Sequence, residues 1–146
     1  METIRNYANL QFDARTENVS FARMAVLGFM SEMNPTMEQI EDVKVAVSEA
    51  VTNAIVHGYQ EESQQVYLSC IREDQRLQIE VMDHGVGIED VEQARQPFFT
   101  TKEENNRTGM GFAFMELFMD ELLVDSRVGK GTRVVMVKYI KGENEQ

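Results

Sequence analysis

Two polar side chains, Glu49 and Asn53, lie one turn apart in a stretch with helical periodicity, and both project away from its apolar positions. A carboxamide oxygen is a suitable ligand for Mg²⁺, which prefers hard oxygen ligands and keeps substrate phosphates in its shell. A carboxylate one turn away could orient or deprotonate an attacking hydroxyl. Small residues dominate positions 48–54, which favours a ligand close to this turn. A solvated polar face is the alternative interpretation.

Glycines form a second candidate feature. Glycine permits positive φ angles and a close approach of the backbone to a ligand, so pairs beside strands and at a helix start favour a nucleotide cradle. A tight turn is the alternative for any one pair. Six of the nine glycines form three Gly-x-Gly pairs, which are Gly85/Gly87, Gly109/Gly111 and Gly129/Gly131. For the last pair, inside a predicted hairpin, a turn explains the spacing.

The common nucleotide-binding fingerprints are missing from the chain. Asp90 stands where a dinucleotide fingerprint beginning at Gly85 has its third glycine, and no Gly-Lys-Ser/Thr phosphate loop occurs. The His-Arg-Asp and Asp-Phe-Gly signatures of protein kinases are also absent. Nucleotide chemistry in this chain would therefore need another architecture.

Periodicity predicts the elements that would position these side chains. Strands are predicted at 7–14, 65–71, 76–82, 122–126 and 132–140, and helices at 19–33 and 110–119. Asn34 and Pro35 end the first helix. Thr36 caps a further helix, with Gln39 completing a capping box and Gly58 placed to end it.

The order of these elements predicts the fold class. Because strands that follow one another in the chain tend to pair antiparallel, we expect an α+β, two-layer sandwich with a mixed, mostly antiparallel sheet and helices on one face. Residues 89–108 lose periodicity and carry many polar side chains. Irregular segments of more than about 12 residues are uncommon in compact domains and are often functional, so this segment is a candidate lid.

Length and composition limit the function classes. At 146 residues we expect one domain, 1–146, and the net charge of −11 argues against binding of nucleic acid. Cys70 is the single cysteine, and the longest apolar stretch, 21–30, is short and interrupted by Arg23. A membrane span needs about 20 apolar residues, so we expect a cytoplasmic protein that does not enter the membrane.

Taken in order, these motifs carry a family resemblance. Glu49 and Asn53 on a helix, the segment DHGVG at 83–87 after a strand, a polar lid closed by TGMG at 108–111, and Gly131-Thr132 before a strand resemble the Bergerat-type ATP-binding fold of gyrase, Hsp90, histidine kinases and MutL. Within that superfamily, segments 48–59, 94–102, 109–112 and 118–121 resemble the serine kinases that act as anti-sigma factors in sporulation.

The resemblance implies ATP or ADP as the ligand, with Mg²⁺. Glu49 would be the catalytic base and Asn53 the magnesium ligand. Asp83 would accept a hydrogen bond from the adenine amino group, and Thr132 would support the base edge through water. Gly85 and Gly87 would let the chain pass close to the nucleotide.

The resemblance also implies which residues bind the phosphates of the nucleotide. The resemblance assigns backbone N–H groups of Gly109, Met110 and Gly111 to the phosphates, at a helix N-terminus whose dipole favours anions. The lid residues Thr101, Lys102 and Arg107 are implied γ-phosphate contacts, and solvated loop side chains are the alternative.

The resemblance also implies partners. They are sigma factor F, an anti-anti-sigma factor phosphorylated on serine, and a second copy of the chain, with Arg23 on the partner surface and the first strand and helix at the dimer interface. Two alternatives stay open: a nucleotide-sensing, sigma-binding module without significant kinase activity, and an anti-sigma kinase of the general stress response. The sequence RQPFFTTK at 95–102 argues against the second, because it is more similar to the sporulation branch.

Overall fold

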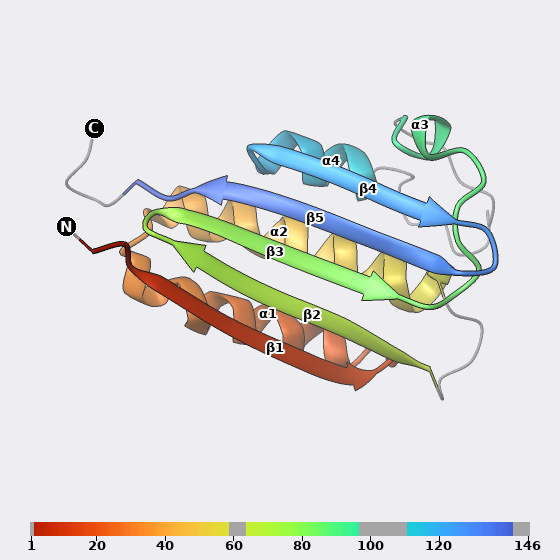
Figure 1. The fold of residues 1–146 in the computed structure, drawn as a ribbon, viewed down its shortest axis with the longest axis horizontal. Coiled ribbons are helices and arrows are strands. Elements are labelled where there is room, and N and C mark those ends of the chain that lie inside the picture. The colour runs from red at the N-terminus through yellow and green to blue at the C-terminus, as the bar shows by residue number, and fades with distance from the viewer. Residues whose placement is uncertain (1, 59–63, 97–110, 142–146) are drawn as a thin grey trace.

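The protein folds into a five-stranded sheet with helices layered on one face (Figure 1). The structure is a computed structural model that describes residues 2–58, 64–96 and 111–141. The elements are β1 (Arg5–Asp13), α1 (Asn18–Met30), η1 (Ser31–Met33), α2 (Met37–Asn53), η2 (Ala54–Gly58), β2 (Gln65–Glu73), β3 (Arg76–Asp83), α3 (Val91–Ala94), α4 (Gly111–Phe118), β4 (Glu121–Arg127) and β5 (Gly131–Tyr139).

The sheet has the order β1-β2-β3-β5-β4, and each of its neighbouring pairs is antiparallel. The predicted α+β class, with helices covering one face, is therefore confirmed. The mixed character that we expected does not occur among the described strands, since no parallel pair is present. The last strand in the chain, β5, lies between β3 and β4 rather than at an edge.

Helix α2 crosses the middle of the sheet and begins as its sequence predicts. The Gln39 backbone N–H donates to Thr36 Oγ1 at 3.1 Å, and the Thr36 N–H donates to Gln39 Oε1 at 3.0 Å, so the capping box is formed. Upstream, Asn34 adopts a left-handed conformation (φ 59°) that ends the preceding 3₁₀ turn. At the far end the regular helix stops at Asn53, and the residues up to Gly58 form a π-helical turn.

The core lies between α2 and the helix-facing rows of the sheet. Val43, Val47 and Val51 of α2 are fully buried, as are Leu77 and Ile79 of β3. Because side chains alternate along a strand, every second residue of β2 and β3 enters this core. This packing fixes the axis of α2 over the centre of the sheet.

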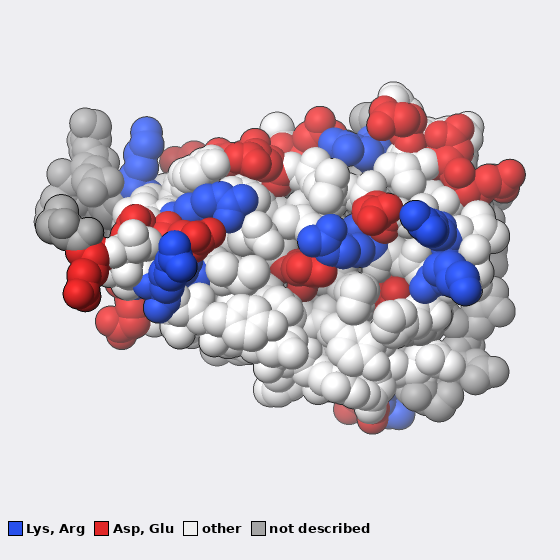
Figure 2. Space-filling model, in the orientation of Figure 1, with Lys and Arg blue, Asp and Glu red and all other residues white. Residues whose placement is uncertain are grey.

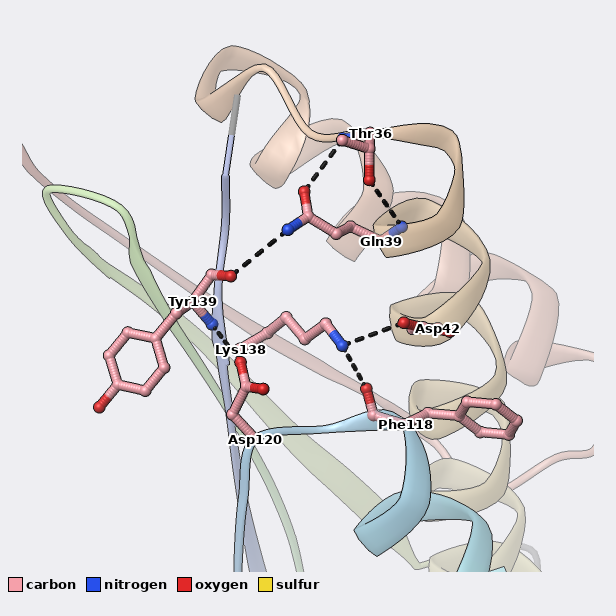
Figure 3. A network of polar contacts seen from close by, with 7 residues as sticks. All are labelled: Thr36, Gln39, Asp42, Phe118, Asp120, Lys138 and Tyr139. Atoms are coloured by element: carbon pink, nitrogen blue, oxygen red, sulfur yellow. Dashed lines mark hydrogen bonds and ion pairs between the residues drawn. The ribbon is translucent and has the colours of Figure 1, made fainter. Parts of the chain in front are cut away.

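A charged side chain stands in one of these core-facing rows. Lys138 follows Val134 and Met136 in the helix-facing row of β5, and its Nζ donates to Asp42 Oδ2 on α2 at 3.0 Å and to the carbonyl oxygen of Phe118 at 2.5 Å (Figure 3). Phe118 is the last residue of α4, where a cation is favoured by the helix dipole. Lys138 thereby links β5, α2 and the end of α4.

Further hydrogen bonds that involve the backbone lie near Lys138. The Tyr139 N–H donates to Asp120 Oδ2 at 2.7 Å, and Gln39 Nε2 donates to the Tyr139 carbonyl at 3.4 Å (Figure 3). The Asp120 N–H in turn donates to the carbonyl of Val137 at 2.8 Å. The end of α4 is consequently attached to β5 at several points.

The opposite face of the sheet carries no helix (Figure 1). Figure 2 shows charged side chains interspersed over the β3, β5 and β4 part of this face, whereas the part over β1 and β2 is largely uncharged. The register explains the difference, because the outward residues in the middle of that pair are Tyr7, Asn9 and Gln11 on β1 and Tyr67, Ser69 and Ile71 on β2. Among the described helices, none combines the length and apolarity needed to cross a membrane.

Candidate functional site

Asn53 and the start of α4 meet at one end of the helix layer. A Cβ built on Gly111 would lie 2.8 Å from Asn53 Nδ2 and 3.2 Å from Oδ1, so only a glycine fits against this carboxamide without a shift. Gly111 is the first residue of α4, whose leading N–H groups have no acceptor within the helix. The structure thus brings the residue predicted to bind metal against a helix terminus predicted to bind phosphate.

Glu49 is half-buried one turn before Asn53 on the same helix. Its neighbour Ser48 accepts a hydrogen bond from Arg23 Nη1 at 3.1 Å and donates to the Lys44 carbonyl at 2.8 Å. Arg23, which the sequence assigned to a partner surface, therefore reaches from α1 across to α2 beside Glu49.

A row of polar side chains crosses the sheet near the same end. Asp83 of β3 pairs with Thr132 of β5, and Thr132 pairs with Ser126 of β4. The preceding row is apolar, with Val81 opposite Val134 and Val134 opposite Val124. The three polar side chains therefore lie on the helix-facing side, where the core ends. The π-helical turn η2, directly after Asn53, packs against β3 and β5, which places this row near Asn53.

Asp83 is only 5% exposed, and its Oδ1 accepts the Gly85 N–H at 2.9 Å. Burial raises the pKa of this carboxyl above its ordinary value, while backbone N–H groups of Gly85 and Thr132 and the nearby His84 act in the opposite direction. A buried carboxylate with unfilled acceptor capacity is suited to take a hydrogen bond from a ligand donor.

The backbone around Asp83 is closely packed at two glycines. Gly131 has φ of 113°, and a Cβ there would lie 2.0 Å from the Asp83 carbonyl oxygen. Gly87 has φ of 78°, and a Cβ there would lie 2.1 Å from the Arg127 carbonyl oxygen. For Gly129 and Gly131, the sequence predicted a turn. Gly129 lies in the β4–β5 turn with open space around it, whereas position 131 requires a glycine because of its close contact with β3.

The donor set suits a particular kind of metal binding. Within residues 2–58, 64–96 and 111–141, no group of three or more His, Cys, Asp or Glu side chains is placed to hold an ion. A single carboxamide such as Asn53, facing a helix N-terminus, fits Mg²⁺ that takes its remaining ligands from nucleotide phosphates and water.

The described part of the predicted lid, 89–96, contains the short helix α3. Asp90 caps it by accepting the Gln93 N–H at 3.0 Å, and Arg95 forms an ion pair with Glu116 of α4 at 3.4 Å. The other lid and loop residues that the sequence singled out, Thr101, Lys102, Arg107, Gly109 and Met110, lie outside the described residues.

Two residues that shape or support this site were not identified from the sequence. Ser126 belongs to the polar row and contacts both Ile88 and Thr132. Lys138 holds the end of α4. The sequence signal for each is a polar residue at a core-facing position of a strand, but the pairing that brings them beside α4 or Asp83 depends on the order of strands in the sheet.

Comparisons with known proteins agree with this architecture. Residues 12–138 match the family model described as "Histidine kinase-like ATPase domain". A protein named anti-sigma F factor from Clostridium acetobutylicum is 51% identical over 92% of this chain and 94% of its own length. Another of that name, from Geobacillus kaustophilus, is 52% identical over 94% of each chain.

Solved structures share the fold at low sequence identity. The crystal structure of the RsbU and RsbW domains of Rv1364c from Mycobacterium tuberculosis matches with a TM-score of 0.66 at 17% identity, covering 92% of this chain and 32% of that one. The catalytic domain of the histidine kinase ThkA matches with a TM-score of 0.56 at 16% identity, covering 93% and 99%.

Proposed function

This chain belongs to the histidine kinase-like ATPase family and, within it, to the anti-sigma F factors, and from this premise we propose that it regulates sigma factor F in two ways. It holds the sigma factor inactive, and it uses ATP to phosphorylate a serine of the anti-anti-sigma factor that would release it. Its expected setting is the cytoplasm of a spore-forming bacterium.

One observation supports ATP as the substrate above the others. The Asn53 carboxamide lies against Gly111 at the start of α4, at the same end of the molecule as the buried Asp83 carboxylate. A triphosphate bound at the helix N-terminus could thus extend toward an acceptor for the exocyclic amine of adenine. We assign the phosphates to backbone N–H groups at 109–111, and Gly85, Gly87 and Thr132 to the side of the base.

The transfer step follows from these assignments. The serine Oγ of the antagonist attacks the γ-phosphorus, the bond between that phosphorus and the β-phosphate oxygen breaks, and ADP departs. Glu49 accepts the proton of the serine hydroxyl, one turn from the metal ligand. Asn53 would hold Mg²⁺ together with the phosphates, and the ion would neutralise part of the charge on the transferred group. Thr101, Lys102 and Arg107 are assigned to the γ-phosphate.

Two substitutions test this mechanism with labelled ATP and the purified anti-anti-sigma factor. Asn53→Ala is expected to reduce transfer at least tenfold at saturating magnesium, and Glu49→Gln to reduce the rate of transfer while ATP still binds. Glu41→Gln, on the exposed side of the same helix, is the matched control and should transfer at the wild-type rate. Normal transfer by either site variant would contradict the role assigned to that residue.

The same assay separates the kinase from a nucleotide sensor. Label on a serine of the antagonist supports the kinase, whereas bound ATP without transfer supports a sensing module. Capture of partners in ATP and in ADP then identifies the sigma factor, and a general-stress sigma factor in place of sigma factor F would overturn the sporulation assignment.

Arg23 is proposed to contact these protein partners. Its guanidinium is held by Ser48 at 3.1 Å, beside Glu49, so a partner docked on α1 would lie next to the transfer site. The net charge of −11 favours a partner with a basic surface. Arg23→Ala is expected to weaken capture of the sigma factor about tenfold, and Arg72→Ala, at the β2–β3 hairpin, is the control that should leave capture unchanged.

A further inference from the structure

Three hydrogen bonds meet at the hydroxyl of Ser126. Its Oγ lies 2.7 Å from the Ile88 nitrogen, 3.1 Å from the Gly131 carbonyl oxygen and 2.8 Å from Thr132 Oγ1. Ile88 belongs to the loop that follows Asp83, while Gly131 and Thr132 open β5. Ser126 therefore joins the two segments on either side of the buried carboxylate.

The direction of each bond follows from the hydrogens available. The Ile88 N–H can only donate, so Ser126 accepts there, and the Gly131 carbonyl can only accept, so Ser126 donates its single hydrogen to it. The remaining contact then has one consistent direction, in which the Thr132 hydroxyl donates to Ser126. With its hydrogen engaged, Thr132 Oγ1 presents only lone pairs to anything else that approaches it.

Thr132 is also the neighbour of Asp83 across the sheet. The two residues are paired on β5 and β3 with their side chains on the helix-facing side, and Asp83 is an acceptor as well. Together they form a short edge that offers acceptors and no side-chain donor. Such an edge matches a ligand group that carries hydrogens and disfavours one that carries lone pairs.

We propose that Ser126 is a specificity-determining residue: by accepting the Thr132 hydrogen it keeps that hydroxyl an acceptor, so that the site takes 6-aminopurine nucleotides and rejects 6-oxopurines. The proposal rests on the proposed function, in which the base lies against Asp83 and Thr132. A 6-amino group donates directly to this edge. A 6-oxo group presents an acceptor in the same place, and Thr132 has no hydrogen left to give it.

The test compares Mg-ATP with Mg-inosine triphosphate, a nucleotide that carries oxygen in place of the 6-amino group. Wild-type protein is expected to bind ATP more tightly. In Ser126→Ala the Thr132 hydroxyl loses its acceptor and can turn to donate to the 6-oxo group. The ratio of the two dissociation constants, measured by calorimetric titration, should then fall about tenfold, chiefly through tighter binding of inosine triphosphate.

Two further variants separate recognition from folding. Ser126→Thr restores a hydroxyl and should restore the wild-type ratio. Ser126→Cys keeps the shape of serine with a weak acceptor and should lower the ratio even where the alanine variant fails to fold. Ser31→Ala is the matched control, because it removes another serine-to-carbonyl hydrogen bond, 2.7 Å long, in the turn after α1. Its ratio should equal that of the wild type.

The outcomes distinguish this proposal from the function on which it rests. A wild-type protein that binds ATP in preference to inosine triphosphate, with an unchanged ratio in Ser126→Ala and Ser126→Cys, overturns the role of Ser126 alone. An equal loss of affinity for both nucleotides in these variants also overturns it, because that is what a purely structural role predicts. Failure of the wild-type protein to bind either nucleotide overturns the proposed function itself.

Discussion

At the scale of the residue, the buried Asp83 carboxylate is unfavourable for folding, and it is also the acceptor of the proposed adenine site. Its carboxyl is buried, and its pKa is raised because burial disfavours the charge. Because the pKa of Asp83 is raised in the folded state, protonation of this carboxyl as the pH falls stabilises the folded protein relative to the unfolded chain. The same protonation removes an acceptor from the proposed adenine site, so folding and binding respond to acid in opposite directions.

A pH titration of ATP binding tests this conflict. We expect affinity to fall as the pH is lowered from neutrality toward 3.8, the ordinary pKa of the residue, because the raised pKa of Asp83 lies above that value. Asp83→Asn should bind ATP at least tenfold more weakly at neutral pH, without this pH dependence, and with a free energy of unfolding within about 1 kcal/mol of the wild type. An acid-induced loss of affinity of the same size in both proteins would assign the effect to another group.

Gly111 gives a second prediction at this scale. A methyl group there would lie 2.8 Å from Asn53 Nδ2, so Gly111→Ala must displace the carboxamide. We expect magnesium-dependent ATP affinity to fall about tenfold, while stability holds or rises, because alanine favours a helix more than glycine. Gly28→Ala in α1 is the matched control, since nothing lies within 4 Å of a Cβ built there. Unchanged affinity in Gly111→Ala would show that Asn53 does not need its present position.

At the scale of elements, contacts link α4 to α2 at both ends of α4. Asn53 at the end of α2 meets Gly111 at the start of α4, and Asp42 near the start of α2 shares Lys138 with Phe118 at the end of α4. The two helices therefore run antiparallel, and the position of the α4 N-terminus along α2 is set from both ends. The side chains of Lys138 and Asp42 are 11% and 20% exposed, so this ion pair is largely removed from water.

Removal of the Lys138 ammonium should be costly because Asp42 would remain buried without its partner. We expect Lys138→Met to lower the free energy of unfolding by about 3 kcal/mol in urea, and the double variant Lys138→Met with Asp42→Leu to recover more than half of that loss. Lys44→Met, which removes an exposed lysine of α2, should change stability by less than about 0.5 kcal/mol. If the double variant were no more stable than the single one, the hydrogen bond to the Phe118 carbonyl would be the larger contribution.

Many of the helices and strands could be predicted from the sequence, for a physical reason. Helix α2 has a capping box and strict periodicity, so local information decides where it begins and which side enters the core. The π-helical turn after Asn53 was not predicted, since an i to i+5 hydrogen-bond pattern leaves no distinct composition. Glu49 and Asn53 could be selected from residue type and spacing, and Asp83 from the family resemblance of the segment that contains it. Ser126 could not, because its role depends on the pairing of Thr132 with Asp83, which is distant in the chain.

At the scale of the whole molecule, the uncovered face of the sheet bears on assembly. We propose a homodimer formed through the first strand and helix, and two features of the uncovered face support a contact on β1: the outward residues in the middle of β1 and β2 are uncharged, and Tyr7 is 61% exposed. Figure 2 shows the uncharged part of this face. In a two-fold dimer the same patch faces itself, so an added charge would meet its own copy.

The prediction is therefore that Asn9→Glu converts the protein from dimer to monomer in sedimentation velocity. Asn9 lies in the middle of β1, paired with Ser69, and like charges there would repel. Leu123→Glu, an outward position on β4 at the opposite edge of the face, is the control and should leave the dimer intact. A monomeric wild-type protein, or a dimer that persists in Asn9→Glu, would contradict an interface on β1.

The position of β5 inside the sheet has a consequence for biosynthesis. Asp83 acquires Thr132 and Ser126 as neighbours only after β5 has inserted between β3 and β4. A nascent polypeptide whose residues 131–139 are still within the ribosome contains β1, β2, β3 and α2, but the proposed base site beside Asp83 still lacks Thr132. The proposed base site is therefore completed late in translation, once β5 has left the ribosome and paired with β3 and β4.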